Sequence, residues 1–173
     1  MSLVTPPRKT LTILVGLLLA VCSGCGGGLD VQPPGSGQVE IKVTDAPAAN
    51  GLSLLLTVGK FQIKGAGDWQ TVVTKSFTID LTPLVGYEQS LGKGYVPAGS
   101  YTQLRFSIAN PVISHSGDNI DASLKSPQPV FPIIARVSEG KLTTILVDIS
   151  GADSFAFQGQ TPVFDIQAKV TVR

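Results

Sequence analysis

The sequence is poor in the residues on which most catalytic and metal sites depend. It has one histidine, one tryptophan and two cysteines among 173 residues, and both cysteines lie in the N-terminal segment, at Cys22 and Cys25. A disulfide within the rest of the chain is therefore excluded, and a zinc site lacks its Cys and His donors. The one histidine, His115, lies between two serines, where we expect a solvated loop rather than a Ser–His–Asp arrangement.

Charge is also scarce. Only 14% of the residues are charged, 43% are hydrophobic, and glycine and proline number 19 and 12. This composition excludes a disordered polymer and favours one domain of short strands and turns over long exposed helices. Without Arg8 and Lys9, which lie in a segment expected to be removed, 11 basic residues face 12 acidic ones. The cations are scattered along the chain, so we expect no nucleic-acid partner.

The first 24 residues have the pattern of a bacterial lipoprotein leader. Arg8 and Lys9 precede an apolar run over 11–21, which is shorter than the roughly 20 apolar residues of a membrane-spanning helix. Two small residues then lead to Cys25, an arrangement that resembles the lipobox of bacterial lipoproteins. The resemblance implies cleavage directly before Cys25 and acylation of its thiol, so that a membrane is the expected partner through this lipid anchor.

Other interpretations of this segment remain open. Acylation of Cys22 would place bulky Val21 directly before the cysteine, where small residues are preferred. A secreted protein without lipid and an uncleaved anchor helix are further alternatives. A Cys-x-x-Cys redox motif needs a folded βα context, and here the pair follows an apolar run and precedes three glycines.

The expected location is the cell envelope. Gly26 follows Cys25, where an Asp would indicate retention in the inner membrane, so the outer membrane is expected if the cell is Gram-negative. Residues 25–37 are rich in glycine, contain two prolines and have little to bury, so they predict a flexible tether. The predicted organisation is a leader over 1–24, a tether over 25–37 and one domain over 38–173.

The rest of the chain alternates apolar and polar residues with the period of a β-strand. The inward parity changes at Gly59, between Val58 and Phe61, which predicts a β-bulge. The segment 110–125 is polar and predicts the longest surface excursion. We expect an all-β, antiparallel two-sheet sandwich of the immunoglobulin or transthyretin type, with a closed barrel as the alternative. Its strands are predicted over 39–44, 52–63, 69–73, 77–81, 104–108, 130–137, 143–149 and 164–172.

Several short motifs carry a family resemblance. In chain order they are Val43-Thr44-Asp45-Ala46-Pro47, Trp69, Ile79-Asp80-Leu81, the run from Val96 to Arg105, and Thr143 to Asp148. Together they resemble the DUF4382 family of bacterial and archaeal envelope proteins, from Gly37 to about Ile149. The resemblance implies a lipid-anchored sandwich of unknown function and brings no catalytic residues. The positions it marks for a structural or functional role are Asp45, Pro47, Asp80, Gly99, Tyr101, Arg105 and Asp148.

Two groups of acidic residues are candidate sites. Asp118, Asn119 and Asp121, with Ser116 beside them, offer the oxygen ligands that calcium prefers, although Asp and Asn also form ordinary turns and the EF-hand spacing is absent. Three further carboxylates either join in one acidic site or accept backbone N–H bonds at turns and strand ends; they are Asp45, Asp80 and Asp148.

Two other side chains have open roles. Arg105 either pairs with one of those three carboxylates or is an exposed charge on a strand face. Trp69 is expected in the core rather than in a ligand platform.

The functional prediction follows mainly from what is missing. The chain lacks the His, Cys and carboxylate groupings of most hydrolases, so we expect no enzyme activity and no cofactor. A non-enzymatic envelope module that binds or displays a protein or carbohydrate, or acts as a scaffold through loops at one end of the sandwich, is the first hypothesis. A structural spacer is the second. A carboxylate-based glycosidase, with two acidic side chains facing each other across a cleft, is the third.

Overall fold

The computed structural model describes residues 32–45, 53–84, 86–115, 118–159 and 161–173. The chain divides into two units, Met1–Asp30 and Val31–Arg173, and the fold below is that of the second. The predicted leader, Cys25 and Pro47 lie outside the described residues. Within the described ranges, no helix has both the length and the apolar character needed to cross a bilayer.

Strands make up most of the described chain. The elements are β1 (Ser36–Asp45), β2 (Ser53–Lys64), β3 (Gln70–Asp80), the 3-10 helix η1 (Thr82–Leu84), β4 (Gln89–Pro97), β5 (Gly99–His115), β6 (Asp118–Asp121), β7 (Ser123–Leu124), β8 (Val130–Val137), β9 (Leu142–Ile149), η2 (Ala152–Ser154), β10 (Phe155–Gln158), β11 (Thr161–Phe164) and β12 (Ala168–Val172).

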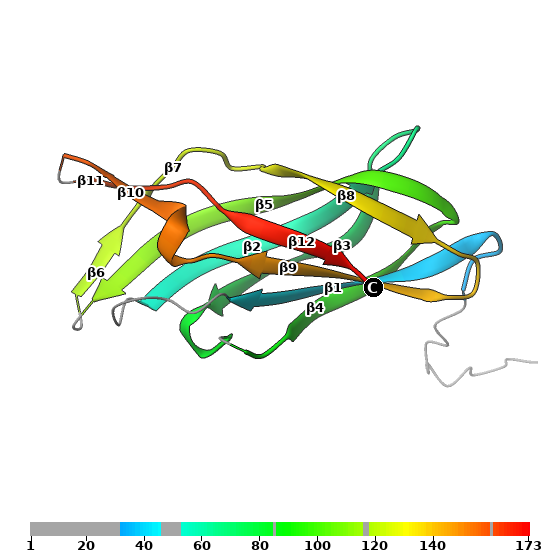
Figure 1. Ribbon diagram of the computed structural model, residues 1–173, viewed down its shortest axis with the longest axis horizontal. Coiled ribbons are helices and arrows are strands. Elements are labelled where there is room, and N and C mark those ends of the chain that lie inside the picture. The colour runs from blue at the N-terminus through cyan, green and yellow to red at the C-terminus, as the bar shows by residue number, and fades with distance from the viewer. Residues whose placement is uncertain (1–31, 46–52, 85, 116–117, 160) are drawn as a thin grey trace, which may run out of the picture. The chain divides into compact units, whose positions relative to one another are not determined.

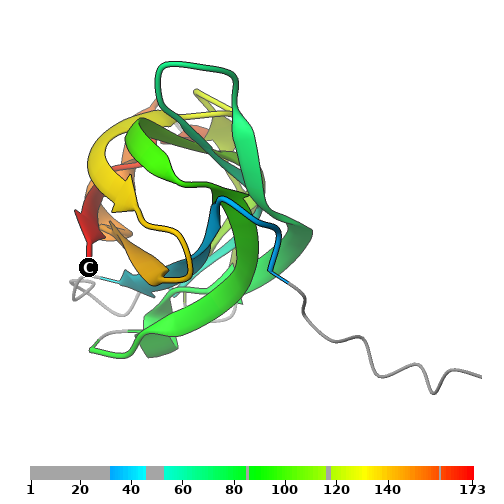
Figure 2. The ribbon, with the colours of Figure 1, turned by 90° about the vertical axis from the view of Figure 1, so that its right-hand side faces the viewer.

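The strands form an all-β sandwich of two main sheets (Figure 1). The first sheet has the order β12-β9-β1-β4. The second has the order β3-β2-β5-β6, with β8 also paired to β5, and a small third sheet has the order β10-β11-β7. In the end-on view of Figure 2, the strands of the two main sheets curve around a common interior.

The sandwich interior is built from the alternation seen in the sequence. Every second side chain of a half-buried strand points inward, so the inward rows of the two main sheets meet. Phe61, Phe106 and Phe131 stack in this core, with ring centroids of Phe61 and Phe106 4.8 Å apart and those of Phe106 and Phe131 5.6 Å apart. Largest among the fully buried side chains are Phe61, Phe106, Phe164, Ile41, Leu56 and Ile63.

The two ends of the sandwich differ in their connections. The chain enters β1 beside the turn between β4 and β5, where Ser36 is in register with Pro97 and the Ala98 N–H donates to the Gly35 carbonyl at 2.9 Å. We call this end the near end, because it is the end at which the chain enters the sandwich. It also holds the β2–β3 turn over 65–69 and the β8–β9 turn over 138–141. The opposite end, the far end, holds the last residue of β1, helix η1, the β5–β6 hairpin and the β10–β11 hairpin.

The predicted bulge in the second strand is confirmed. Leu54, Leu56 and Val58 are buried on one side of the change and Phe61 and Ile63 on the other, and the pairing register of β2 shifts between Gly59 and Phe61. Lys60 is the extra residue, with a positive φ of 47° and an exposed side chain. The left-handed conformation of this one residue returns the apolar row to the core.

Several features differ from the expected strands. The segments 69–73 and 77–81 form one strand, β3, because a register shift lets Val72 and Val73 both be buried. The expected excursion over 110–125 is mostly the β5–β6 hairpin. The last predicted strand is divided into β11 and β12, which lie in different sheets.

A further difference concerns strand direction. β1 and β9 pair in parallel, as do β7 and β11, whereas the other pairs are antiparallel. Also, β1 starts at Ser36, so the end of the predicted tether belongs to the folded unit.

Candidate functional site

The three carboxylates expected either to converge or to stabilise the backbone all lie at the far end, but on different surfaces. Asp45 is in register with the buried Ile149, so it points to the interior side of the first sheet. Asp148 precedes Ile149 and points to the outer side of that sheet. Asp80 follows the buried Ile79 and is exposed on the outer side of the second sheet. The strand alternation therefore separates these three side chains, and the joint acidic site is not formed.

Asp45 has a structural contact that links distant parts of the chain. Its side chain is buried, and its Oδ1 accepts a hydrogen bond from the Gly151 N–H at 3.2 Å. We expected such a bond from the Asp45-Ala46-Pro47 turn, whose last two residues lie outside the described set. The observed bond fixes the end of β1 to the turn that follows β9. A carboxylate that accepts a backbone N–H is stabilised when buried.

Asp148 has one carboxylate oxygen that none of the described residues hydrogen-bonds. The side chain lies on the outer face of the first sheet, in register with Thr44 of β1 and Lys169 of β12. Its Oδ1 is buried and has no hydrogen-bond partner among the described residues. Most buried polar atoms in proteins are paired, so this oxygen is the most unusual polar atom of the far end.

The calcium candidates lie on a strand rather than in a loop. Asp118, Asn119 and Asp121 belong to β6 and are exposed; in register they face His115, Ser114 and Val112 of β5, respectively. Successive strand residues point to opposite faces, so Asn119 and Asp121 share one face and Asp118 has the other. Within the described ranges, no group of three or more His, Cys, Asp or Glu side chains is placed to hold a metal ion.

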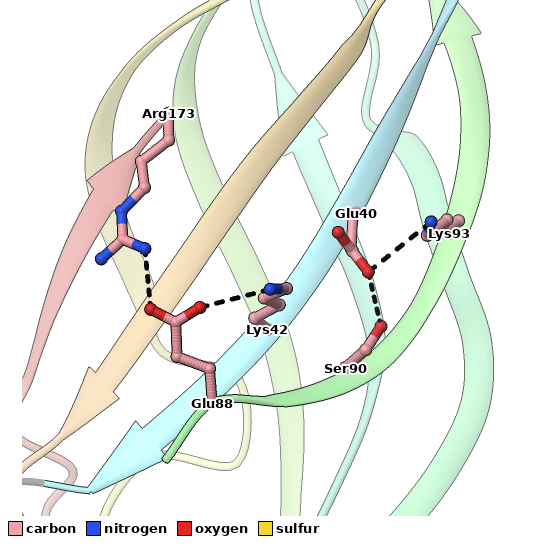
Figure 3. A network of polar contacts seen from close by, with 6 residues as sticks. All are labelled: Glu40, Lys42, Glu88, Ser90, Lys93 and Arg173. Atoms are coloured by element: carbon pink, nitrogen blue, oxygen red, sulfur yellow. Dashed lines mark hydrogen bonds and ion pairs between the residues drawn. The ribbon is translucent and has the colours of Figure 1, made fainter. Parts of the chain in front are cut away.

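A charge network covers part of the outer face of the first sheet (Figure 3). Glu88 accepts a hydrogen bond from Arg173 at 2.7 Å and one from Lys42 at 3.2 Å. These hydrogen bonds from Arg173 and Lys42 lower the pKa of Glu88 below its usual 4.5. In the same view, Glu40 accepts a hydrogen bond from Ser90 at 2.9 Å and is paired with Lys93 at 3.8 Å.

This network joins strands on both sides of β9. Lys42 belongs to β1 and Arg173 follows β12, and these strands flank β9 in the sheet. Leu146 of β9 lies on the same outer face, in register with Lys42, yet it is only 6% exposed. The long side chains of the network are placed to cover it, as aliphatic stems of cations often do. Local sequence pattern contains no sign of this arrangement, because its members are 46 and 85 residues apart.

The near end collects the motif that runs from Val96 to Arg105. Tyr101 is buried, and its hydroxyl donates to the Pro97 carbonyl at 2.7 Å, while burial raises the pKa of the Tyr101 phenol. Gly65 of the neighbouring turn approaches the Ser100 carbonyl so closely that a Cβ would overlap it. These two turns border a shallow hollow of about 300 Å³, in which Asp68 is the one acidic residue.

Arg105 does not pair with any of the three aspartates. Its Nε donates to Gln62 Oε1 at 3.0 Å, and Gln62 Nε2 donates to Thr71 Oγ1 at 3.0 Å. The guanidinium carbon lies 4.1 Å from the centroid of the Trp69 ring, a cation–π geometry. Trp69 is half-buried on the outer face of the second sheet, so the expectation that it lies in the core is wrong.

Exposed large apolar side chains lie at the far end and along one side of the sandwich, and two more, Val130 and Leu142, lie apart from these groups. Tyr87, Ile120 and Phe157 are 73%, 45% and 66% exposed, and all three belong to far-end segments. Along one side of the sandwich, between the edge strands β8 and β12, a groove of about 440 Å³ is lined mainly by Pro132, Ile133, Ile134, Val170 and Val172. No carboxylate lines this groove, so it lacks the acid pair of a glycosidase.

Taken together, these observations define a mixed β-sandwich whose described part holds no grouped catalytic side chains. Residues 36–162 match the family described as domain of unknown function DUF4382. The chain belongs to this family, as its motifs predicted. No curated protein and no solved structure matches the chain, so the likeness to immunoglobulin or transthyretin-type domains stays a prediction.

Proposed function

We propose that this protein is a lipid-anchored module of the cell envelope that binds a protein or carbohydrate partner at its far end and catalyses no reaction. The observation that carries the proposal is that the chain enters the folded unit at one end, while three exposed apolar side chains lie at the other. The chain enters the sandwich at the near end, beside Pro97. Tyr87, Ile120 and Phe157 are exposed at the far end.

The anchor is supported by the leader pattern and by the short length of chain between Cys25 and the folded unit. Seven peptide units separate Cys25 from Gln32, and an extended chain of that length spans about 25 Å. A lipid on Cys25 would therefore hold the near end close to the bilayer. The far end, with its exposed apolar side chains, would face outward and remain accessible to a partner.

Binding is favoured over the two alternatives by different features. A spacer needs no exposed aromatic side chains, and Tyr87 and Phe157 are exposed by 73% and 66%. A glycosidase needs two carboxyl groups about 5 to 10 Å apart across a cleft. Asp45 is buried on the interior side of the first sheet, and Asp148 and Asp80 lie on the outer sides of the first and the second sheet, respectively.

The anchor is tested by labelling cells with a palmitate analogue and measuring the mass of the N-terminal peptide. Cys25→Ser should abolish the label and leave the protein in the soluble fraction. Cys22→Ser is the matched control and should retain the label, because residue 22 is removed with the leader. A chain that keeps residues 1–24 and carries no acyl group would contradict the anchor.

The binding role is tested in cells with a photo-crosslinking amino acid. Placed at Phe157, it should give one discrete crosslinked species on the cell surface. Placed at Thr74, an exposed position midway along β3, it should give none. No crosslinked species at either position would favour the spacer, and equal crosslinking at both would contradict a binding surface confined to the far end.

A further inference from the structure

Acidic and basic side chains are sorted along the length of the sandwich. Residues 32–173 contain 11 acidic and 11 basic residues, so their formal charges cancel. Eight of the acidic residues belong to far-end segments: Asp45, Asp80, Glu88, Asp118, Asp121, Asp148, Asp153 and Asp165. Only two of the basic residues in this range, Lys125 and Lys169, lie there with them.

The strand register supports this assignment. Asp148 and Lys169 lie level with Thr44, one residue before the end of β1, and Glu88 precedes Gln89, which is in register with Val43. Asp80 ends β3, and Asp118 and Asp121 belong to β6 in the β5–β6 hairpin. Lys125 and Asp165 form an ion pair beside the β10–β11 hairpin.

The remaining part of the described sandwich has the opposite balance. It holds three acidic residues, Glu40, Asp68 and Glu139, and nine basic ones: Lys42, Lys60, Lys64, Lys75, Lys93, Arg105, Arg136, Lys141 and Arg173. Six negative charges are thus in excess at the far end and six positive charges in excess elsewhere. Glu88 lies at the boundary and is paired with Lys42 and Arg173 across it.

The cations toward the near end include Lys64 and Arg105 of the second sheet, and Arg136 and Lys141 on either side of the β8–β9 turn. Arg136 and Lys141 are exposed, and neither forms an ion pair with another described residue. Lys64 lies 5.9 Å from the Trp69 ring, next to Arg105. Two acidic residues, Asp68 and Glu139, accompany them, and the Glu139 carboxylate accepts the Gly35 N–H at 2.8 Å.

We propose that this charge separation orients the anchored domain on an anionic phospholipid surface, with the near end toward the bilayer and the far end away from it. The inference rests on the proposed function, because it takes Cys25 as the point of attachment. An anionic leaflet attracts each nearby basic residue by about 1 kcal/mol, and the effect falls off within a Debye length of about 8–10 Å. Lys64, Arg136 and Lys141 adjoin the near-end turns and come within that range when the near end meets the surface, whereas the far-end carboxylates do not.

A tether alone would keep the near end close to the membrane but would let the domain tilt. A domain lying on its side would bring far-end carboxylates to the anionic surface, where they are repelled. The upright orientation is therefore favoured only on anionic lipid. It would hold Tyr87, Ile120 and Phe157 as far from the bilayer as the sandwich allows.

The test uses the mature chain, residues 25–173, in which Cys25 is the sole cysteine and Trp69 the sole tryptophan. Its thiol is coupled to a maleimide lipid in vesicles of phosphatidylcholine, with or without phosphatidylglycerol, that contain a dansyl headgroup acceptor. Energy transfer from Trp69 reports the distance of the near end from the lipid surface. A second protein, with Trp69→Phe and Phe157→Trp, reports the far end.

The ratio of near-end to far-end transfer should rise by roughly twofold or more when phosphatidylglycerol is included, given about 1 kcal/mol for each cation near the surface. High salt should remove the rise. Lys64→Glu with Lys141→Glu should also remove it. The matched control, Lys125→Glu with Lys169→Glu, makes the same change in net charge at the far end and should keep the rise.

Two results would overturn the orientation. One is the same transfer ratio on both kinds of vesicle, and the other is an equal effect of the two double variants. Thermal melting of each variant shows that the fold is kept. Since the vesicles hold the chain through Cys25 chemically, this measurement is independent of acylation in cells. A missing acyl group in cells would refute the proposed anchor without changing the vesicle result.

Discussion

Arg105 lies 4.1 Å from the centre of the Trp69 ring while its Nε donates a hydrogen bond to Gln62. Arg105 and Trp69 come from β5 and from the turn before β3, which are joined through β2. Gln62 is buried and extends the contact to Thr71. One guanidinium thus connects three adjacent segments of the second sheet on its outer face.

Replacing this guanidinium should destabilise the fold and expose the indole. We expect Arg105→Ala to lower the free energy of unfolding by about 1–2 kcal/mol, from loss of the cation–π contact and of a hydrogen bond to a buried amide. Urea denaturation followed by Trp69 fluorescence measures this loss, and the native emission should shift to longer wavelength. Arg136→Ala, at an exposed arginine of β8, should change neither the stability nor the emission.

Asp45 should prove structural rather than functional. Asp45→Ala leaves the Gly151 N–H without its carboxylate acceptor, and a buried unpaired group is destabilising by about 1–3 kcal/mol. Asp45→Asn keeps an acceptor oxygen and should lose less. Urea denaturation compares both with Asp121→Ala, a change at an exposed residue of β6. A stable Asp45→Ala protein that loses far-end crosslinking would instead assign Asp45 to the binding surface.

Glu88 should make the stability depend on pH in the acid range. Its folded pKa is below 4.5 because Arg173 and Lys42 donate hydrogen bonds to it, so its contribution is present above pH 4.5 and is lost as the pH falls through the folded pKa. The difference in melting temperature between the native protein and Glu88→Gln should therefore be largest near neutral pH and vanish in acid. Added salt should reduce it, since the pair is solvent-exposed. A difference that grows as the pH falls would contradict this sign.

Much of the sandwich could be predicted because its strands alternate. The rows Val39-Ile41-Val43 and Leu54-Leu56-Val58 are buried as expected, and the bulge followed from a single change of parity. The same alternation explains why the predicted acidic site is not formed. Asp45 and Asp148 are one residue apart in the register of β1 and β9, so their side chains point to opposite faces of the sheet.

The features that were missed depend on long-range pairing, which local pattern does not contain. The parallel pairing of β1 with β9 brings Asp45 to Gly151, 106 residues away in the chain. The ion pairs of Glu88 and the hydrogen bond of Gln62 follow from the order of the strands. Local pattern likewise does not identify Arg105 and Thr71 as the partners of Gln62. The separation of acidic and basic residues between the two ends also could not be predicted, because it depends on the direction of each strand in the sheets.

Gly94 of β4 and Gly99 of β5 differ in whether the structure has room for a side chain. A Cβ at Gly94 of β4 would overlap backbone atoms of Val72 in β3, so it would push apart the two edges that close one side of the sandwich. We expect Gly94→Ala to lower the free energy of unfolding by about 1–3 kcal/mol, as overpacking does. At Gly99 of β5, by contrast, φ is not positive and an added Cβ would meet no atom within 4 Å.

Gly99→Ala should therefore leave the stability within about 0.5 kcal/mol of the native value, although the residue belongs to the family motif. Urea denaturation of both variants under identical conditions makes the comparison. If Gly99→Ala folds normally but weakens the near-end approach to anionic vesicles, the motif glycine acts at the membrane side of the domain. If Gly99→Ala unfolds like Gly94→Ala, the turn is more constrained than its open surroundings indicate.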